Sequence, residues 1–480
     1  MTLRRLTYWI TILAIFAMAA RISVDSDTWW HLRAGQWMVE KRTLLTTDPF
    51  SYTRFGESWL YPGWLFEVPM YWIFKTFGAG GLNLMTALMV TLAFIFVWTV
   101  LSGDTFVRSF ALIFAAAAAG VYWSARPHLV TLLFTAIFLK ILEDHRWQYN
   151  LAQRKRLFWL PGLMILWVNS HGGFILGFIL WGVYALDGIL AWALKKTESA
   201  RVWELLLNGG LMVVGVCLNP SGAHMLLYPF HTVGIRTLQN YIQEWQSPNF
   251  HDLAVQPFAW LLLVLVGMLG LSKNRIALTD FLLCTGLAYM SLLAGRNIAI
   301  FALVAPVVIT RHAAPIVTEW VANRMKQPAS NEINISARTR INWLIFSLVL
   351  LAVGLKVAIV LPASANERYF RESLPVAAVE YLKGHNYAGN LFNAYDWGGY
   401  LLWSLPEYPV FIDGRTDLYN DEIINQWLQV VRAEPGWQET LESWNIRLIL
   451  IEPDRPVVLL LPQYGWKNIF QDNHAVIFAK

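Results

Sequence analysis

Charged residues are scarce in this sequence. They make up 14% of the 480 residues, whereas hydrophobic residues make up 56%. A soluble domain has about 25% charged residues, so this chain has too few to cover a water-facing surface of its size. The shortage excludes an ordinary soluble protein and predicts an integral membrane protein.

Cysteines and several catalytic motifs are also lacking. The two cysteines, Cys217 and Cys284, lie in apolar runs, which excludes a disulfide framework and predicts small buried side chains. The sequence has no Walker motif, no glycine-rich dinucleotide fingerprint, no His-Glu-x-x-His and no Gly-x-Ser-x-Gly. It has no nucleic-acid recognition module, so its net charge of +5 is not interpreted as nucleic-acid binding.

Long apolar runs are abundant, and a helix of about 20 apolar residues spans a bilayer. Counting such runs predicts a polytopic α-helical protein with about eleven transmembrane helices. The predicted spans lie near residues 5–21, 82–101, 107–122, 128–143, 157–169, 173–194, 203–219, 256–271, 276–294, 297–310 and 341–362. The 25 tryptophans fit this class of protein, because indole rings gather where a bilayer meets water.

Basic residues in the connecting loops predict the orientation. They gather in four stretches, namely His145–Arg156, Lys195–Arg201, Lys273–Arg275 and Arg311–Arg340. Basic loops lie on the cytoplasmic side, and all four do so if the N-terminus is cytoplasmic and Trp59–Phe77 is a helix that does not span. We therefore predict a multi-pass plasma-membrane protein with its N-terminus inside. Four segments are then outside, namely Ile22–Gly81, Tyr122–Pro127, Pro220–Val255 and the chain after about Ala363.

The last part of the chain changes character, because it has mixed polarity and no apolar run of spanning length. Its patterns predict strands at Gly389–Asn393, Tyr408–Ile412, Arg447–Ile451 and Ala475–Ala479. They predict helices at Pro375–Lys383, Asn420–Val431 and Trp437–Trp444. We therefore predict two domains: a transmembrane domain over residues 1–363, with its first external loop at 22–81, and an extracytoplasmic α/β domain over residues 364–480.

The first external loop begins with a cluster of ionisable residues, Asp25-Ser26-Asp27-Thr28-Trp29-Trp30-His31-Leu32-Arg33. Charges beside hydrocarbon are costly and tend to be functional. Two Asp near an imidazole can act as a general base or hold a divalent cation. The alternative is a charged helix start, with Asp27 as its N-cap and the two tryptophans at the interface.

Further polar residues lie on the predicted outer side. His171, in Asn169-Ser170-His171-Gly172-Gly173, could bind a phosphate or be an ordinary hydrogen-bonded loop histidine. Arg296 could bind a diphosphate with its planar fork or extend towards the interface. Arg126 and His128 are comparable candidates, and the loop Pro220–Val255 carries the cluster Tyr241, Glu244 and Trp245.

The motif Asp25-x-Asp27-x-Trp-Trp-His31-x-Arg33 after a first span, continued by Gly35, Lys41 and Thr47-Asp48-Pro49-Phe50, resembles the catalytic subunit of oligosaccharyltransferase. More broadly, it is similar to GT-C glycosyltransferases, which use polyprenyl-linked sugars. The resemblance places an essential Asp at Asp27. It implies the catalytic residues Asp27, Asp25 and His31, with Asp25 and Asp27 as ligands of a divalent cation such as Mg²⁺ or Mn²⁺.

A second stretch, Asn393-Ala394-Tyr395-Asp396-Trp397-Gly398-Gly399-Tyr400, resembles the acceptor-binding Trp-Trp-Asp-Tyr-Gly element of the same family. It is followed by Val410-Phe411-Ile412-Asp413-Gly414-Arg415, which resembles the family's hydrophobic strand ending in Asp. The resemblance implies an acceptor site formed by Tyr395, Asp396, Trp397, Asp413 and Arg415. The alternative is a structural turn in which Asp396 caps a helix over Trp397–Leu405. In the family's second external loop another carboxylate motif helps hold the metal, whereas the loop Tyr122–His128 has none.

Together these features predict a glycosyltransferase that moves a sugar from a polyprenyl-phosphate or polyprenyl-diphosphate donor to an acceptor at the outer membrane face. The acceptor, a protein, a glycan or a lipid, is not identified by the sequence. The donor-binding residues predicted are Arg33, Arg126, His128, His171 and Arg296. Two alternatives remain open: a non-catalytic GT-C relative that binds a lipid-linked glycan, and a transporter or flippase.

Overall fold

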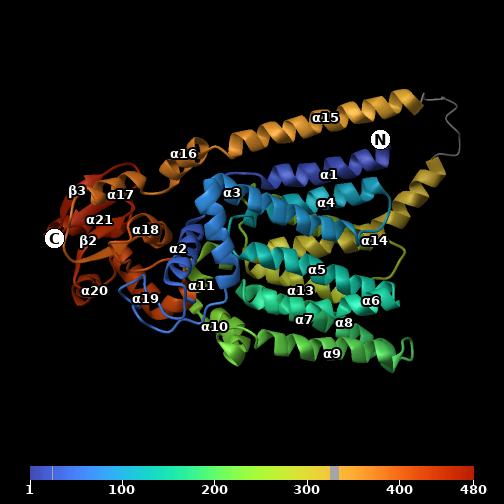
Figure 1. Ribbon diagram of the computed structural model, residues 1–480, viewed down its shortest axis with the longest axis horizontal. Coiled ribbons are helices and arrows are strands. Elements are labelled where there is room, and N and C mark those ends of the chain that lie inside the picture. Colours follow the sequence, from blue (N-terminus) through green and yellow to red (C-terminus); the bar gives the residue numbers. More distant parts are fainter. Residues whose placement is uncertain (24, 325–334) are drawn as a thin grey trace.

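The computed structural model describes residues 1–23, 25–324 and 335–480, so residues 325–334 of the predicted basic stretch Arg311–Arg340 lie outside the described residues. Its larger part is a bundle of helices that run side by side (Figure 1). They are α1 (Leu3–Ala19), α3 (Trp64–Trp98), α4 (Thr105–Ala119), α5 (His128–Trp147), α6 (Leu151–Leu157), α7 (Trp159–Val168), α8 (Ile175–Ala193), α9 (Ser199–Val216), α12 (Gln256–Leu271), α13 (Leu278–Leu293), α14 (Ile298–Arg324) and α15 (Ile335–Val360).

Each predicted span coincides largely with one of these helices, but the predicted number of about eleven spans is not confirmed. Within the described ranges, five helical stretches are long and apolar enough to cross a membrane, and α12 and α13 are apolar but shorter. The five are Trp64–Trp98, Thr105–Tyr122, Gly172–Ala193, Gly295–Asn323 and Ser336–Val360. They identify the bundle as the membrane part of the protein.

Helix α3 is bent at Gly78, where the backbone leaves the helical region at φ 62° and ψ −161°. Glycine accepts this conformation because it has no Cβ. The bend separates a first helical stretch, which carries the buried Glu67, from the apolar stretch that follows. The helix predicted over Trp59–Phe77 therefore begins at Trp64 and is distinct from the next span, although both belong to α3.

The segments between the bundle helices form short elements at one end of the bundle. The first external loop contains α2 (Ser26–Lys41), which packs on α3 and lies where the bundle meets the C-terminal part (Figure 1). The loop Pro220–Val255 forms η3 (Gly222–Leu227), α10 (Tyr228–Gly234), α11 (Arg236–Tyr241) and η4 (Gln243–Trp245). Short 3-10 turns also precede the bundle helices on this side, namely η1 (Gly120–Tyr122), η2 (Gly172–Phe174) and η5 (Gly295–Asn297).

The C-terminal part contains a four-stranded sheet with the order β1-β2-β4-β3, in which only β1 and β2 are parallel. Its strands are β1 (Asn390–Asn393), β2 (Ile446–Ile451), β3 (Lys467–Gln471) and β4 (Val476–Ala479). Its helices are α16 (Ala363–Ser373), α17 (Val376–Lys383), α18 (Gly398–Ser404), α19 (Thr416–Val431), α20 (Trp437–Ser443) and α21 (Pro456–Leu460), with the turns η6 (Tyr395–Trp397) and η7 (Leu461–Tyr464). The predicted mixture of helices and strands is thus present.

The prediction of a strand over Tyr408–Ile412 is wrong. This segment is buried except for Pro409, but it lies outside the sheet and forms only an isolated bridge between Val410 and Ser51. Its backbone is paired instead with the Asn393 side chain, which accepts from the Phe411 N–H at 2.9 Å and donates to the Ile412 carbonyl at 2.8 Å. A side chain from β1 therefore takes the place of a neighbouring strand.

The buried apolar side chains form two separate clusters. One lies within the bundle. The other joins the first external loop, through residues such as Trp29, Trp30 and Leu32, to the interior of the C-terminal part, including Leu401 and Phe411. The first external loop and the C-terminal part consequently fold around one common core, which fixes the position of α2 relative to the sheet.

Candidate active site

Asp25 and Asp27 lie at the start of α2. Asp25 is the N-cap, and its Oδ1 accepts a hydrogen bond from the Asp27 N–H at 2.9 Å. Aspartate is favoured at this position because its carboxylate pairs with an N–H that has no partner within the helix. The alternative drawn from the sequence took Asp27 as the N-cap, whereas the structure has Asp25 in that position. The Asp27 side chain is therefore free to pair with another group.

That partner is Arg126, in the loop before α5. Its Nη2 lies 2.9 Å from Asp27 Oδ2, and its Nη1 lies 3.3 Å from Asp25 Oδ2. The loop is attached to α2 as well, because the Thr28 hydroxyl donates to the Ala125 carbonyl at 3.1 Å. Arg126 and Asp27 keep 20% and 18% of their side chains exposed, so the pair is accessible to a substrate.

Glu244, in η4, brings the loop Pro220–Val255 to the same place. Its Oε2 lies 3.2 Å from Arg126 Nη1, and its Oε1 lies 3.5 Å from Arg296 Nη1. Arg296 in turn lies over the Trp245 ring, with 4.2 Å between its Cζ and the ring centre. Three carboxylates thus face two guanidinium groups, which leaves one negative charge in excess.

The two carboxylates that face Arg126 from opposite sides differ in proton affinity. Burial raises the pKa of Asp27 to about 7, although Arg126 opposes this shift, and the negative charges of Asp25 and Glu244 add to it. Burial would also raise the pKa of Glu244, but Arg126 and Arg296 outweigh it and lower that pKa to about 2. Glu244 is therefore a fixed anion near neutral pH, whereas Asp27 can take up and release a proton.

Two histidines lie in the same neighbourhood. His171 Nδ1 is paired with the Thr131 hydroxyl at 2.7 Å and accepts from the Gly173 N–H at 3.0 Å, which leaves the ring proton on Nε2. Burial and the charge of Arg296 lower the pKa of His171, so its ring is neutral. His128 Nε2 donates to the Tyr122 carbonyl at 2.7 Å, and its buried Nδ1 has no protein partner.

The C-terminal part packs directly on the carboxylate end of α2. A Cβ on Gly399 would lie 2.6 Å from the Ser26 carbonyl oxygen, and a Cβ on Gly414 would lie 1.8 Å from Asp27 Oδ1. Only glycine permits so close an approach. The two stretches that the sequence singled out, one in the first external loop and one in the C-terminal part, therefore meet.

Tyr395 and Asp396, from the second stretch, lie at the edge of this contact. Burial raises the pKa of the Tyr395 phenol, and the nearby negative charge of Asp27 raises it further. Asp396 is exposed, while Trp397 is buried among the side chains of the C-terminal core. The cap predicted for Asp396 is not observed, because the helix that follows begins without a side-chain cap.

Two residues of the first motif point elsewhere. His31 is buried, and its Nδ1 is paired with the Glu67 carboxylate of α3. Arg33 donates to Gln36 on the same helix at 2.9 Å and lies over the Phe50 ring. Neither residue makes an ion pair with Asp25 or Asp27 among the described residues. The catalytic role predicted for His31 and the donor-binding role predicted for Arg33 are therefore not part of the function proposed below.

Asp413 and Arg415 are also directed away from Asp27. Arg415 is fully buried and donates to Asp413 Oδ2 and to Asp48 Oδ1, each at 2.6 Å. The Tyr419 hydroxyl completes this network by donating to Asp413 at 2.7 Å. These groups hold the first external loop to the C-terminal part, and they are not available to bind an acceptor.

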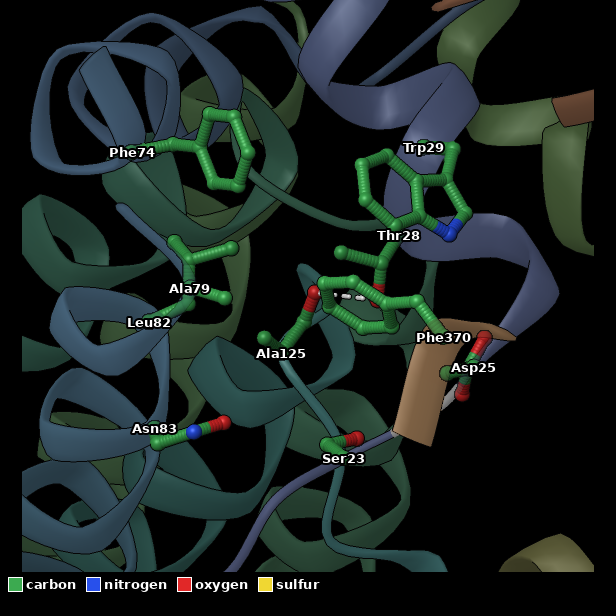
Figure 2. A pocket seen from close by; sticks show the side chains of 10 residues that line it. All are labelled: Ser23, Asp25, Thr28, Trp29, Phe74, Ala79, Leu82, Asn83, Ala125 and Phe370. Carbon is green, nitrogen blue, oxygen red and sulfur yellow. Dashed lines mark hydrogen bonds between the residues drawn. The ribbon is translucent and has the colours of Figure 1, made fainter. Parts of the chain in front are cut away.

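A small pocket lies beside Asp25, between α2, α3 and α16 (Figure 2). Its walls combine apolar side chains with the polar side chains of Ser23, Asp25, Thr28 and Asn83. The lining residues are Ser23, Asp25, Thr28, Trp29, Phe74, Ala79, Leu82, Asn83, Ala125 and Phe370.

The residues present do not fit the divalent cation that the family resemblance implies. The Arg126 guanidinium occupies the position between the carboxylates of Asp25, Asp27 and Glu244 where such an ion would have to lie. Within residues 1–23, 25–324 and 335–480, no group of three or more His, Cys, Asp or Glu side chains could hold a metal ion.

The sequence singled out Glu244, with Tyr241 and Trp245, as a cluster in the loop Pro220–Val255, but it did not give Glu244 a role or a partner. It also left Glu67 without a role, although a carboxylate in a largely apolar stretch is itself a signal of a buried partner. The partners of both residues come from distant segments, and spacing along the chain does not identify them.

No protein-family model and no curated protein sequence matches this chain. Solved structures do match. The archaeal oligosaccharyltransferase AglB of Archaeoglobus fulgidus, solved with an inhibitory peptide and a dolichol-phosphate, has a TM-score of 0.61 over 96% of this chain and 71% of that chain, at 13% identity. The oligosaccharyltransferase of Archaeoglobus fulgidus tethered to an acceptor peptide with the NVT sequon has a TM-score of 0.54 over 92% and 69%, at 14% identity. The chain therefore has the fold of these archaeal oligosaccharyltransferases, the family that its motifs resemble.

Proposed function

Starting from the GT-C fold, we propose that the protein is a glycosyltransferase that uses a polyprenyl-phosphate or polyprenyl-diphosphate sugar. The observation that supports this most is the meeting of two distant segments at Asp27. The packing of Gly414 against Asp27 brings the predicted acceptor segment to a carboxylate with a pKa of about 7.

Asp27 is the proposed general base. A base is most effective when its pKa lies near the working pH, and Asp27 meets this condition. It takes the proton of the acceptor nucleophile while that atom forms a bond to the anomeric carbon of the donor sugar. The bond from that carbon to the phosphate oxygen breaks, and the anomeric configuration is inverted because no covalent enzyme intermediate forms.

Arg296 is the proposed partner of the leaving phosphate, together with the Nε2–H of His171. Arg296 is 30% exposed and shares Glu244 at 3.5 Å, a longer contact than those of Arg126. A planar guanidinium binds two phosphate oxygens at once. When the sugar–phosphate bond breaks, the developing negative charge is stabilised by this group and by the imidazole donor.

The pocket beside Asp25 has the apolar side chains of Phe74, Leu82 and Phe370 next to the carboxylates (Figure 2). Its volume of about 10 Å³ is that of a single water molecule, so the isoprenoid chain of the donor is not assigned to it. We propose that the exposed Asp396 and the phenol of Tyr395 orient the acceptor on the opposite side of Asp27.

The proposed location is the plasma membrane, with the N-terminus in the cytoplasm and the site outside. The N-terminus, α6 and the turn between α8 and α9 lie at the end of the bundle away from the C-terminal part (Figure 1). The basic loops His145–Arg156 and Lys195–Arg201 are thus at the end opposite to α2, which is consistent with the positive-inside rule (Figure 1). We retain the division into residues 1–363 and 364–480 as a proposal.

A second candidate is a non-catalytic GT-C relative that binds a lipid-linked glycan. The observation that favours it is the absence of a carboxylate in the loop Tyr122–His128, where Arg126 occupies the centre of the site. A protein of this kind would bind the donor without breaking its sugar–phosphate bond.

The test is incubation of the purified chain with a panel of labelled polyprenyl-phosphate and polyprenyl-diphosphate sugars. Release or transfer of the sugar from one donor class is the expected result, and it would identify that class. Tight binding of a donor without release would replace the proposal by the second candidate. The absence of both would remove both functions.

A further inference from the structure

The three carboxylates of the site share one guanidinium. Asp25 and Asp27 approach Arg126 from α2, at 3.3 and 2.9 Å, and Glu244 approaches it from η4, at 3.2 Å. The carboxylates come from two outer segments far apart in the sequence. Arg126 is the group that holds them at one point.

The position of Arg126 is fixed by its loop. Its N–H donates to the Ser124 carbonyl at 2.9 Å, and the neighbouring Ala125 carbonyl accepts from Thr28 of α2 at 3.1 Å. The Arg126 side chain is 20% exposed and has a carboxylate on each side. Moving it out would require breaking three ion pairs at once.

A divalent cation and a guanidinium require different surroundings. Mg²⁺ requires oxygen ligands at about 2.0–2.1 Å in an octahedral arrangement. A guanidinium instead donates hydrogen bonds of about 2.7–2.9 Å in its own plane. The contacts of 2.9–3.3 Å around Arg126 are of the second kind, and a metal ion at the same point would meet a like charge.

We propose that Arg126 takes the place of a catalytic divalent cation, so that the carboxylates are assembled by a built-in charge and transfer requires no metal. The part concerning transfer rests on the function proposed above, whereas the part concerning metal binding does not. Arg126 is a positioning residue here: it holds Asp27 beside the acceptor segment. Where they stand, the three carboxylates do not hold a metal ion. Removing the Arg126 side chain leaves them without a counter-ion and free to close around a cation in its place.

Titration with Mn²⁺, followed by the loss of its free electron paramagnetic resonance signal, tests metal binding without any activity. Wild type is expected to leave the signal unchanged. Arg126→Ala is expected to bind one Mn²⁺ per chain, and Arg126→Ala combined with Asp27→Asn is expected to bind it at least about tenfold more weakly, because one ligand has lost its charge. Arg126→Lys keeps the charge and is expected to behave as wild type.

The control is Arg371→Ala, which removes an exposed arginine paired with Glu380 outside the site. It should bind no Mn²⁺. Binding of Mn²⁺ by wild type that is lost in Asp27→Asn would overturn the proposal, and this comparison does not require Arg126→Ala to fold. A folded Arg126→Ala that binds no Mn²⁺ would also overturn it.

Transfer measured after dialysis against EDTA tests the second part. Unchanged transfer supports the proposal, whereas transfer that is lost and then restored by Mg²⁺ or Mn²⁺ overturns it. If no donor is turned over under any condition, the proposed function fails. The Mn²⁺ titration still decides whether Arg126 excludes a metal, so the two failures are distinguishable.

Discussion

At the scale of the residue, the protonation of Asp27 governs the proposed reaction. The base must be ionised to accept a proton, and burial raises the pKa of Asp27 to about 7. We therefore expect kcat/KM to rise with pH through a midpoint near 7 and to be roughly tenfold lower at one pH unit below that midpoint than on the plateau. A pH profile of kcat/KM for the acceptor, measured at acceptor concentrations below saturation, checks this, and a profile that is flat from pH 5 to 8 would contradict it.

Glu244 should displace this midpoint in a known direction. Its negative charge raises the pKa of Asp27. Glu244 also forms an ion pair with Arg126, the group that lowers the pKa of Asp27. Glu244→Gln removes the charge and keeps the shape, so the pKa of Asp27 should fall and the midpoint of the profile should move to lower pH. Each profile is normalised to its own plateau, because the loss of the contact with Arg296 will also change the absolute rate.

Glu422→Gln is the matched control for Glu244→Gln. Glu422 also pairs with an arginine, Arg54, but its side chain is 64% exposed and lies outside the site. Its variant should leave the midpoint unchanged. A midpoint that moves upward in Glu244→Gln, or stays in place while the protein remains folded, would show that Glu244 does not act on the base.

At the scale of the element, the site depends on how closely the C-terminal part approaches α2. Gly414 has no room for a side chain, because a Cβ would lie 1.8 Å from Asp27 Oδ1. Gly414→Ala should displace the Asp27 carboxylate from the position in which it faces the acceptor. Since a displacement of about 1 Å can cost about 100-fold in rate, we expect kcat to fall by roughly that factor while the chain still folds.

Gly162→Ala, in the interior of α7, is the control for this variant, because a Cβ there meets nothing within 4 Å. It should keep the wild-type kcat. Elution by size-exclusion chromatography in detergent shows whether both variants are folded. Wild-type turnover in Gly414→Ala would mean that the contact between these two elements does not position the base.

At the scale of the whole molecule, the two ends of the bundle should lie on opposite sides of the membrane. Lys155 lies in α6, at the end of the bundle away from the C-terminal part (Figure 1), and His385 follows α17 in the C-terminal part; both are exposed. In a background in which Cys217 and Cys284 are replaced by Ala, His385→Cys should react with an impermeant maleimide added to intact cells. Lys155→Cys should react only after the membrane is opened, and the reverse pattern would invert the orientation.

The bundle was predictable because apolar runs are a local property of the sequence. The buried segment Val410–Ile412 was not, because its backbone partners are Asn393 and the first external loop. The site follows the same rule. Asp25, Asp27, Arg126 and Arg296 were identified because each lies beside the end of an apolar run, in a segment predicted to be outside.

The roles predicted for His31 and Arg415 could not be refined from the sequence for the same physical reason. Their partners, Glu67 and Asp48, lie in other segments and neutralise them within the folded chain. Spacing along one helix shows which residues share a face, but it does not show which distant carboxylate will satisfy a buried cation or imidazole.

The most direct test of the account is the initial rate of sugar transfer by wild type and Asp27→Asn, measured side by side with the donor identified from the panel. Glu372→Gln, which removes an exposed carboxylate paired with Arg368 outside the site, serves as the control. The account predicts equal rates for wild type and the control, and a rate at least about 100-fold lower for Asp27→Asn with donor binding retained. Transfer by Asp27→Asn at the wild-type rate would contradict it.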